Sequence, residues 1–300
     1  MKQDIALNFT KKTTKHLKRP YSRVLIVFTV IFAIYSLILL FPFFWVFINS
    51  FKDGFEEFKI NSWNFPEKWM FSNYATVFQL DQFNVVEMFF NTILLCLITP
   101  TLSVLSTTLA AYVMAKYKFH GRGFIYILYL LPMIVSIAGT TTSVYMLLDN
   151  WGLTNSFGSI ILLSMGGTGM NFLLVYAVFK NISDNYAEAA RIDGAGDYRI
   201  FFQVMLPQAM GIIGTLWILG FIGSWNDYAT PKIFLGSDYY TIATGLEKIK
   251  ALVEKGGNIQ LLHNYPVYFA AIIISMLPVV IIFLIFQKQI MKISLGGGLK

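Results

Sequence analysis

Residues 188–207 read EAARIDGAGDYRIFFQVMLP, and the first half of this stretch is polar and of helix-forming composition. Long apolar runs lie on either side, at 150–179 and 200–226. Each run exceeds the roughly 20 residues that a helix needs to cross the hydrocarbon core of a bilayer. The pattern therefore predicts two membrane spans joined by a polar segment.

The rest of the chain repeats this apolar pattern. Of its 300 residues, 56% are hydrophobic and only 13% are charged, whereas about 25% is usual in a soluble domain. Six windows lack Asp, Glu, Lys and Arg, namely Val24–Phe51, Met88–Ala115, Gly123–Leu148, Asn150–Phe179, Ile200–Asn226 and Asn264–Gln287. The runs are continuously apolar, which excludes barrel strands. We expect an all-α, polytopic protein with six transmembrane helices.

The distribution of basic residues predicts the orientation. With the N-terminus in the cytoplasm, 16 of the 23 lysine and arginine residues lie on the cytoplasmic side and 7 lie outside. The positive-inside rule then favours N-in, C-in. We expect a cytoplasmic segment 1–23, a six-helix domain 24–290 and a cytoplasmic tail 291–300 in a multi-pass protein of the cell membrane. The first apolar run is too long for a signal peptide, so it is expected to be retained.

The net charge of +7 is explained by basic residues that flank the spans, so no nucleic-acid partner is expected. No phosphate-binding G-x-x-x-x-G-K-[ST] loop occurs, which argues against ATP binding by this chain. The three histidines fall in separate loops without metal-ligand spacing. The sequence therefore predicts neither an enzyme nor a bound metal or cofactor.

Small and polar residues near the spans have a structural and a functional interpretation. For the glycine run 166–169, and for Gly220 with Ser224, close helix packing is favoured over ligand binding. Asp227 ends the fifth window beside Pro231. An interfacial position is favoured for it over a role in transport.

Two outer loops are long. The loop 52–87 is rich in aromatic residues, which fit an interfacial belt and contact with an external partner about equally well. The loop 231–263 contains an amphipathic helix candidate at 245–255, which Gly256 and Gly257 would end.

The polar segment between the fourth and fifth spans predicts a helix, a bend and a second helix. Ala187–Ile192 favours helix, and Ser183 with Asp184 is expected to cap it. Gly194 and Gly196 break this helix, and Asp197 is expected to cap the next one. Such a lever suits coupling between a soluble motor and membrane helices.

These residues match the EAA loop of ABC-importer permeases: E-A-A at 188–190, then three residues and Gly194, then nine residues and Val204, with Leu206 and Pro207 after it. Further stretches along the chain, such as SFK at 50–52 and GLTNS at 152–156, resemble carbohydrate-importer permeases of the MalG type. One departure is Ser183, where the family often has proline.

The resemblance implies a MetI-like fold with a cytoplasmic coupling helix in the loop 183–207. It implies that this loop docks on a dimer of separate ATPase subunits, which would bind ATP and Mg²⁺. The residues expected to couple are Glu188, Ala189, Ala190, Asp193, Gly194, Leu206 and Pro207. The flexible tail 294–300 would also reach the ATPase pair.

The resemblance further implies a second homologous permease, a carbohydrate substrate and an extracellular solute-binding protein. Contact with that binding protein is expected from the last outer loop, at Gly245, Lys248, Lys250, Glu254 and Asn264. A non-sugar importer stays open within this class. An ion-coupled secondary transporter or a membrane enzyme is disfavoured, because the span windows hold no ionisable group and no catalytic cluster appears.

Overall fold

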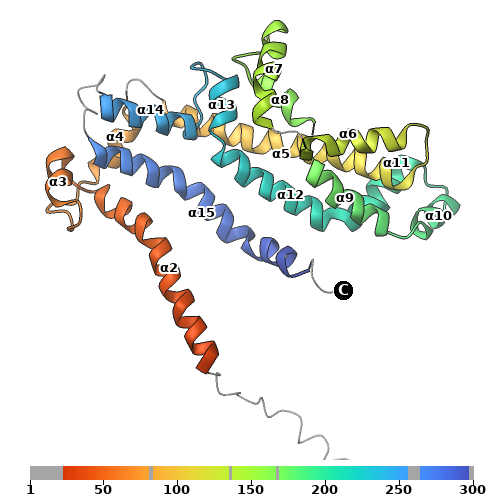
Figure 1. Cartoon of the computed structure of the whole chain (residues 1–300), viewed down its shortest axis with the longest axis horizontal. Helices are drawn as coiled ribbons and strands as arrows, with labels where there is room; N and C mark the ends of the chain where they lie inside the picture. Colours follow the sequence, from red (N-terminus) through yellow and green to blue (C-terminus); the bar gives the residue numbers. More distant parts are fainter. Residues whose placement is uncertain (1–22, 81–83, 135–136, 167–168, 256–263, 297–300) are drawn as a thin grey trace, which may run out of the picture. The chain divides into compact units, whose positions relative to one another are not determined.

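The computed structural model describes residues 23–296 except 81–83, 135–136, 167–168 and 256–263. Every regular element in these ranges is a helix, so the all-α prediction is confirmed (Figure 1). The chain divides into two compact units, residues 1–48 and 49–300. The predictions for residues 1–22, for the stop at Gly256 and Gly257, and for residues 297–300 fall outside the described residues.

The first unit is formed by helix α2 (Arg23–Asn49). It carries no charge after Arg23, and its large apolar side chains are exposed from Val24 to Phe44. A helix that is apolar all round is either buried in protein or surrounded by lipid. Because α2 is apolar on every side, it has the surface of a membrane span.

Helices α5 (Val85–Lys116), α12 (Leu206–Asn226) and α15 (Tyr265–Gly296) are also long and apolar. Asn84 caps α5, since its side chain accepts the Glu87 backbone N–H. Helix α15 ends six residues beyond the expected domain boundary at 290. Residues 294–296, which are part of the expected flexible tail, are therefore helical.

Close packing joins α5 to α12. A Cβ atom added at Gly220 would lie 2.8 Å from the Cβ of Pro100, so only glycine fits without a shift. Four residues on, the Ser224 hydroxyl lies 2.8 Å from the Thr99 hydroxyl. The predicted packing role of Gly220 and Ser224 is confirmed.

The third and fourth charge-free windows each contain two helices. The third holds α6 (Arg122–Ile134) and α7 (Ile137–Asn150), and the fourth holds α8 (Phe157–Ser164) and α9 (Gly169–Asn181). In the described residues, four helices are long and apolar enough to cross a membrane, or six spans if each bent pair counts as one. Pro132 near the end of α6 removes a backbone hydrogen bond, which favours an interruption there.

Helix α9 packs between α5 and α6. Its side chains Phe172, Val175 and Phe179 are fully buried. A Cβ at Gly169 would lie 2.7 Å from the Tyr129 carbonyl oxygen of α6. The packing role predicted for the glycine run is thus confirmed at Gly169, whereas Gly167 and Thr168 lie outside the described residues.

The two outer loops contain short helices: α3 (Gly54–Asn61) and α4 (Ser72–Phe78) in the first, and α13 (Ala229–Phe234) and α14 (Ile242–Lys255) in the second. Helix α14 confirms the amphipathic helix expected at 245–255 and begins three residues earlier.

The aromatic residues of the first outer loop divide into two sets. The rings of Trp69 and Tyr74 lie 5.1 and 5.2 Å from the Phe51 ring, which is buried at the start of the loop. Trp63 and Phe65 are instead exposed. The first set holds the start of the loop together.

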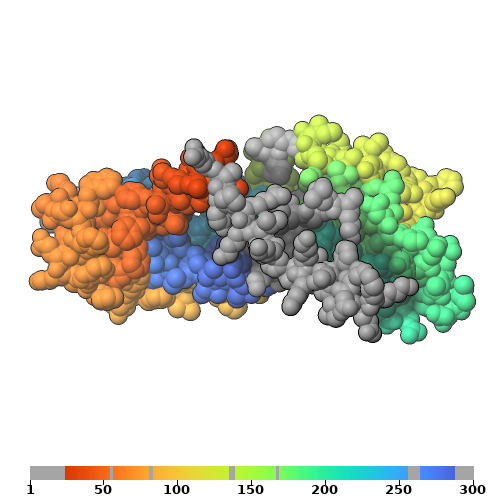
Figure 2. Space-filling view, turned by 90° about the horizontal axis from the view of Figure 1, so that it is seen from below, coloured from red at the N-terminus to blue at the C-terminus, as the bar shows by residue number. Residues whose placement is uncertain are grey.

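The second unit places the predicted cytoplasmic and outer segments apart. Helices α10 (Asn185–Ile192) and α11 (Asp197–Arg199) lie at one end, and α3 and α14 lie at the other (Figure 1). Figure 2 shows the same separation from another side, with the orange α3 region and the green α10 region far apart. This arrangement is what segments on opposite faces of a membrane require.

Candidate functional site: the coupling segment

The predicted coupling segment, residues 183–207, folds as a short helix, a sharp turn and the start of a long helix. The Ser183 hydroxyl accepts the backbone N–H of Asn185 at 3.3 Å, so Ser183 supplies the expected capping oxygen. Asp184 occupies the cap position of α10 without a capping hydrogen bond from its side chain. Its carboxylate turns to Lys116 of α5 instead.

Gly194 ends α10 through its backbone conformation. Its φ is +80°, in the left-handed region where a side chain is strained. The N–H of Ala195 bonds the Ala190 carbonyl at 2.9 Å, and the N–H of Gly194 bonds the Arg191 carbonyl at 3.0 Å. This pair of bonds is the Schellman arrangement that closes helix ends. The breaking role expected of Gly194 is confirmed.

The expected capping role of Asp197 is wrong. Gly196 occupies the cap position of α11, and the Asp197 side chain makes no capping bond. One oxygen of its carboxylate accepts from the Arg191 guanidinium at 3.1 Å and from the Tyr117 hydroxyl at 3.2 Å. The hydrogen bond to Asp197 raises the pKa of Arg191. A cation on the preceding helix offers this carboxylate a stronger partner than a neutral backbone N–H.

The Lys116 side chain joins three helix ends. Its ammonium donates to Asp184 Oδ1 at 2.6 Å and to the Ile182 carbonyl oxygen at 2.5 Å. Ile182 follows the last residue of α9, and Lys116 is the last residue of α5. The Lys116 side chain is only 9% exposed, whereas that of Asp184 is 73% exposed.

The residues predicted to couple divide between the surface and the interior. Glu188, Ala189, Asp193 and Gly194 are exposed, and Pro207 is exposed at the start of α12. Ala190 and Leu206 are half-buried and pack against an aromatic and aliphatic core that includes Tyr112, Phe179 and Phe201. Exposed residues suit contact with a partner, and the half-buried pair attaches the segment to the spans.

Sequence reasoning missed two large apolar side chains on this surface. Ile192 is 86% exposed and Tyr198 is 85% exposed. They flank the Gly194 turn, one on each side. Large apolar residues inside a polar loop were the available signal, since such residues are usually covered by a partner when they gather on a surface.

A widened turn precedes Pro207. Residues Ile200–Met205 form the π-helix η1, and the Leu206 N–H bonds the Phe201 carbonyl five residues back. Proline lacks the N–H that a regular α-helix would need at position 207, and its ring clashes with the carbonyl four residues earlier. The Leu-Pro pair thus favours a wide turn where the coupling segment enters α12.

The outer contact candidates are placed unequally. Lys248, Lys250 and Glu254 are exposed on α14. Gly245 is buried, and a Cβ added there would clash with the Met88 sulfur. Asn264 is half-buried, and its side chain accepts the backbone N–H of Val267 at the start of α15. Gly245 therefore lets α14 pack against α5, and Asn264 caps the start of α15, so both residues stabilise the loop.

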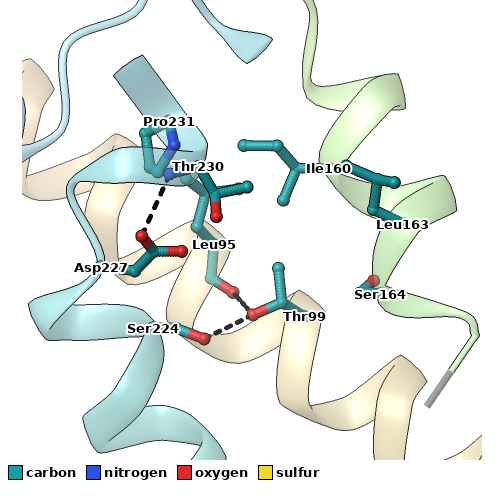
Figure 3. Close-up of a pocket in the computed structure, with 9 residues that line it drawn as sticks. All are labelled: Leu95, Thr99, Ile160, Leu163, Ser164, Ser224, Asp227, Thr230 and Pro231. Atoms are coloured by element: carbon teal, nitrogen blue, oxygen red, sulfur yellow. Dashed lines mark hydrogen bonds between the residues drawn. The ribbon is translucent and has the colours of Figure 1, made fainter. Parts of the chain in front are cut away.

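A cavity of about 340 Å³ lies between α5, α8, α12 and α13 (Figure 3). Thr99, Ser224 and Asp227 line one side, and Ile160 and Ser164 of α8 face them. The Asp227 carboxylate accepts the backbone N–H of Thr230 at 3.1 Å, which gives it a structural role beside α13. The hydroxyl and carboxylate oxygens can hydrogen-bond a small polar solute.

No group of three or more His, Cys, Asp or Glu residues stands close enough to hold a metal ion in the described part of the chain.

Comparison with known proteins identifies the class. The family described as "Binding-protein-dependent transport system inner membrane component" matches residues 103–292. The arabinooligosaccharides transport system permease protein AraQ of Bacillus subtilis is 30% identical over 279 residues, with 92% of this chain and 95% of AraQ covered. The diacetylchitobiose uptake system permease protein NgcG of Streptomyces coelicolor is 29% identical over 259 residues, with coverage of 86% and 83%.

Among solved structures, a bacterial ABC transporter involved in the import of the acidic polysaccharide alginate superimposes with a TM-score of 0.77. It is 25% identical, and the match covers 88% of this chain and 95% of the alginate transporter chain.

The long apolar helices and the family match define a multi-pass permease of the cytoplasmic membrane. The chain belongs to the family of inner membrane components of binding-protein-dependent transport systems. The resemblance to ABC-importer permeases and the expected membrane location are confirmed. The family is one of membrane permeases, which are not themselves enzymes.

Proposed function

We propose that this chain is one of two permease subunits of an ATP-driven importer whose cargo is an oligosaccharide. The names of the relatives support the cargo, since AraQ carries arabinooligosaccharides, NgcG carries diacetylchitobiose and the alginate transporter imports a polysaccharide. All three substrates are chains of sugar units. The expected class of carbohydrate importer follows from them.

The observation that carries the mechanism is the surface of the coupling segment. Ile192 and Glu188 are exposed four residues apart on α10, which is capped at both ends, and Tyr198 is exposed on α11 beyond the Gly194 turn. Exposed apolar side chains together with a carboxylate support docking on a protein rather than on lipid. The proposed partner is a dimer of ATPase subunits that bind ATP and Mg²⁺. These subunits are separate chains, because this sequence has no phosphate-binding loop.

The route of coupling follows the backbone. Movement of α10 is transmitted through α11 and η1 into α12, which packs closely on α5. Closure of the ATPase pair would bring two such segments together and rock the helices between inward-facing and outward-facing states. The segment 183–207 therefore serves as the coupling loop of a permease domain at 24–290, which the cytoplasmic segments 1–23 and 291–300 flank.

A solute-binding protein is the proposed outer partner, as the family description suggests. The exposed residues Lys248, Lys250 and Glu254 of α14 are the contact surface. Gly245 and Asn264 contribute by holding α14 against α5 and by capping α15. Exposed apolar side chains, such as Leu105 of α5 and Leu219 of α12, are available to lipid and to a second homologous permease.

The test is reconstitution in proteoliposomes with the partner permease, the ATPase subunits and the binding protein. The expected result is ATP-dependent uptake of at least one oligosaccharide from a panel, together with sugar-stimulated ATP hydrolysis. ATP-dependent uptake of a non-sugar solute alone would overturn the proposal that the cargo is an oligosaccharide. Uptake driven by an ion gradient without ATP would replace the importer by a secondary transporter.

A further inference from the structure

Two residues at the cytoplasmic end of α5, Lys116 and Tyr117, bond residues that lie before and after α10. Lys116 bonds Asp184 and the Ile182 carbonyl, immediately before α10. Tyr117 bonds Asp197, immediately after the turn that ends α10. Arg191 of α10 shares the same Asp197 oxygen. Contacts from the last residue of α5 and from the residue that follows it thus lie on both sides of the eight residues of α10.

We propose that Lys116 and Tyr117 are positioning residues that lock α10 to α5, so that a push on α10 moves α5 as well as α12. This inference rests on the proposed function, since it concerns the same coupling segment. The backbone alone links α10 only to α9 and to α12. The side chains of Lys116 and Tyr117 link α10 to a third helix, α5, so that α5 would move together with α9 and α12.

Burial distinguishes the Lys116 contact from an ordinary surface ion pair. Exposed pairs contribute little because both charges stay hydrated, and the Arg191–Asp197 pair, with side chains 55% and 64% exposed, is of this kind. Lys116 is nearly buried and donates to a carboxylate and a carbonyl at once. Its removal leaves the Ile182 carbonyl at the end of α9 without its donor. A nearly buried lysine with these two acceptors is held in position as well as neutralised in charge.

The packing beneath the segment makes the lock stiff. The Tyr112 ring of α5 lies 5.8 Å from the Tyr117 ring, 5.4 Å from the Phe179 ring of α9 and 4.7 Å from the Phe201 ring of η1. Aromatic contacts at these distances favour defined geometries. Lys116 and Tyr117 therefore act at the edge of a rigid core, where a displaced α10 cannot slide freely past α5.

The test uses the reconstituted transporter with Lys116→Met, Lys116→Arg, Tyr117→Phe and the control Lys118→Met. Lys118 is exposed two residues further on. The first measurement is the number of sugar molecules imported per ATP hydrolysed. We expect Lys116→Met to lower this ratio about tenfold, since a lost hydrogen bond to a charged group is of that order. Lys116→Arg should restore most of it, Tyr117→Phe should lower it less, and Lys118→Met should match the wild type.

The second measurement reports position directly. Spin labels at Ile192 and Val113, both exposed, are introduced in a Cys96→Ala background, and the distance between them is measured by pulsed electron paramagnetic resonance. Lys116→Met should broaden the distance distribution, whereas Lys118→Met should leave it unchanged.

The outcomes separate the two proposals. A wild-type import ratio and an unchanged label distance in Lys116→Met overturn the lock and leave the proposed function intact. Absence of ATP-dependent uptake by the wild-type transporter overturns the proposed function itself. If Lys116→Met fails to accumulate in the membrane, Asp184→Ala replaces it, because Asp184 is exposed and alanine leaves Lys116 with the Ile182 carbonyl alone. An unchanged ratio and distance in Asp184→Ala would likewise overturn the lock.

Discussion

The Cα of Gly220 faces Pro100 so closely that an added Cβ would stand 2.8 Å from the proline Cβ. Gly220 lies on α12, into which the coupling segment continues, and Pro100 lies on α5, whose end contacts the coupling segment. Small residues permit this approach in a membrane, where helices associate through packing rather than through the hydrophobic effect.

Substitution of Gly220 by leucine should therefore separate α5 from α12. We expect a loss of stability of about 1–3 kcal/mol, the usual range for overpacking. Unfolding in detergent, followed by tryptophan fluorescence, measures it. Gly223→Leu is the matched control, because no atom lies within 4 Å of a Cβ at that position. Equal stability of the two variants would contradict the packing role of Gly220.

Gly194→Ala should loosen the end of α10 through backbone strain alone. The cost of a left-handed conformation for a non-glycine residue is roughly 1–2 kcal/mol, and Gly194→Asn should cost less because asparagine tolerates it. Hydrogen exchange of the amides in 185–199 should accelerate, and sugar-stimulated ATP hydrolysis should fall.

Gly196→Ala is the control for this prediction. At neither glycine would an added Cβ meet an atom within 4 Å, but Gly196 has a φ of −75° that alanine adopts freely. If both alanine variants behaved alike, the left-handed turn would not be what matters at Gly194.

Lys248→Glu should weaken contact with the binding protein. The side chain is exposed on α14, and we expect it to meet an acidic group of the partner. The binding-protein concentration for half-maximal ATPase stimulation should rise about fivefold, which corresponds to about 1 kcal/mol for one exposed charge pair. Lys118→Glu, on the predicted cytoplasmic side, is the control. A half-maximal concentration that stayed constant would remove Lys248 from the contact surface.

Lys52 makes stability depend on pH in the outer loop. Its side chain is buried, and burial lowers its pKa from 10.5, although the nearby Glu57 opposes the shift. Between the lowered pKa and 10.5, the unfolded chain binds more protons than the folded chain, so stability rises with pH there.

The difference between wild type and Lys52→Met isolates this contribution. The wild type should gain thermal stability as the pH rises toward 10.5, relative to the variant, whose position 52 does not titrate. Parallel pH profiles for the two proteins would show that Lys52 keeps its ordinary pKa. The variant also loses the bond from the Lys52 ammonium to the Asn61 carbonyl, which lowers stability equally at every pH below the lowered pKa.

The sequence by itself determined the class, the long helices and the local form of the coupling segment. Apolar runs predict spans because lipid tolerates few charges. The helix at 185–192 and the break at Gly194 follow from propensity and from backbone freedom, which act over a few residues. The EAA spacing identified the family for the same reason, since the motif is local.

The tertiary structure decided which partners the charged and small residues find. The Asp197 carboxylate, expected to cap a helix, instead accepts a hydrogen bond from Tyr117, 80 residues away in the sequence. Lys116 donates a hydrogen bond to the carbonyl of Ile182, 66 residues away. Gly245 proved to be buried against Met88, and two windows each held a pair of helices. Side-chain pairing between distant segments depends on how the helices pack, and no local pattern contains that information. The contacts of Lys116 and Tyr117 on which the proposed lock rests therefore appear only in the folded chain.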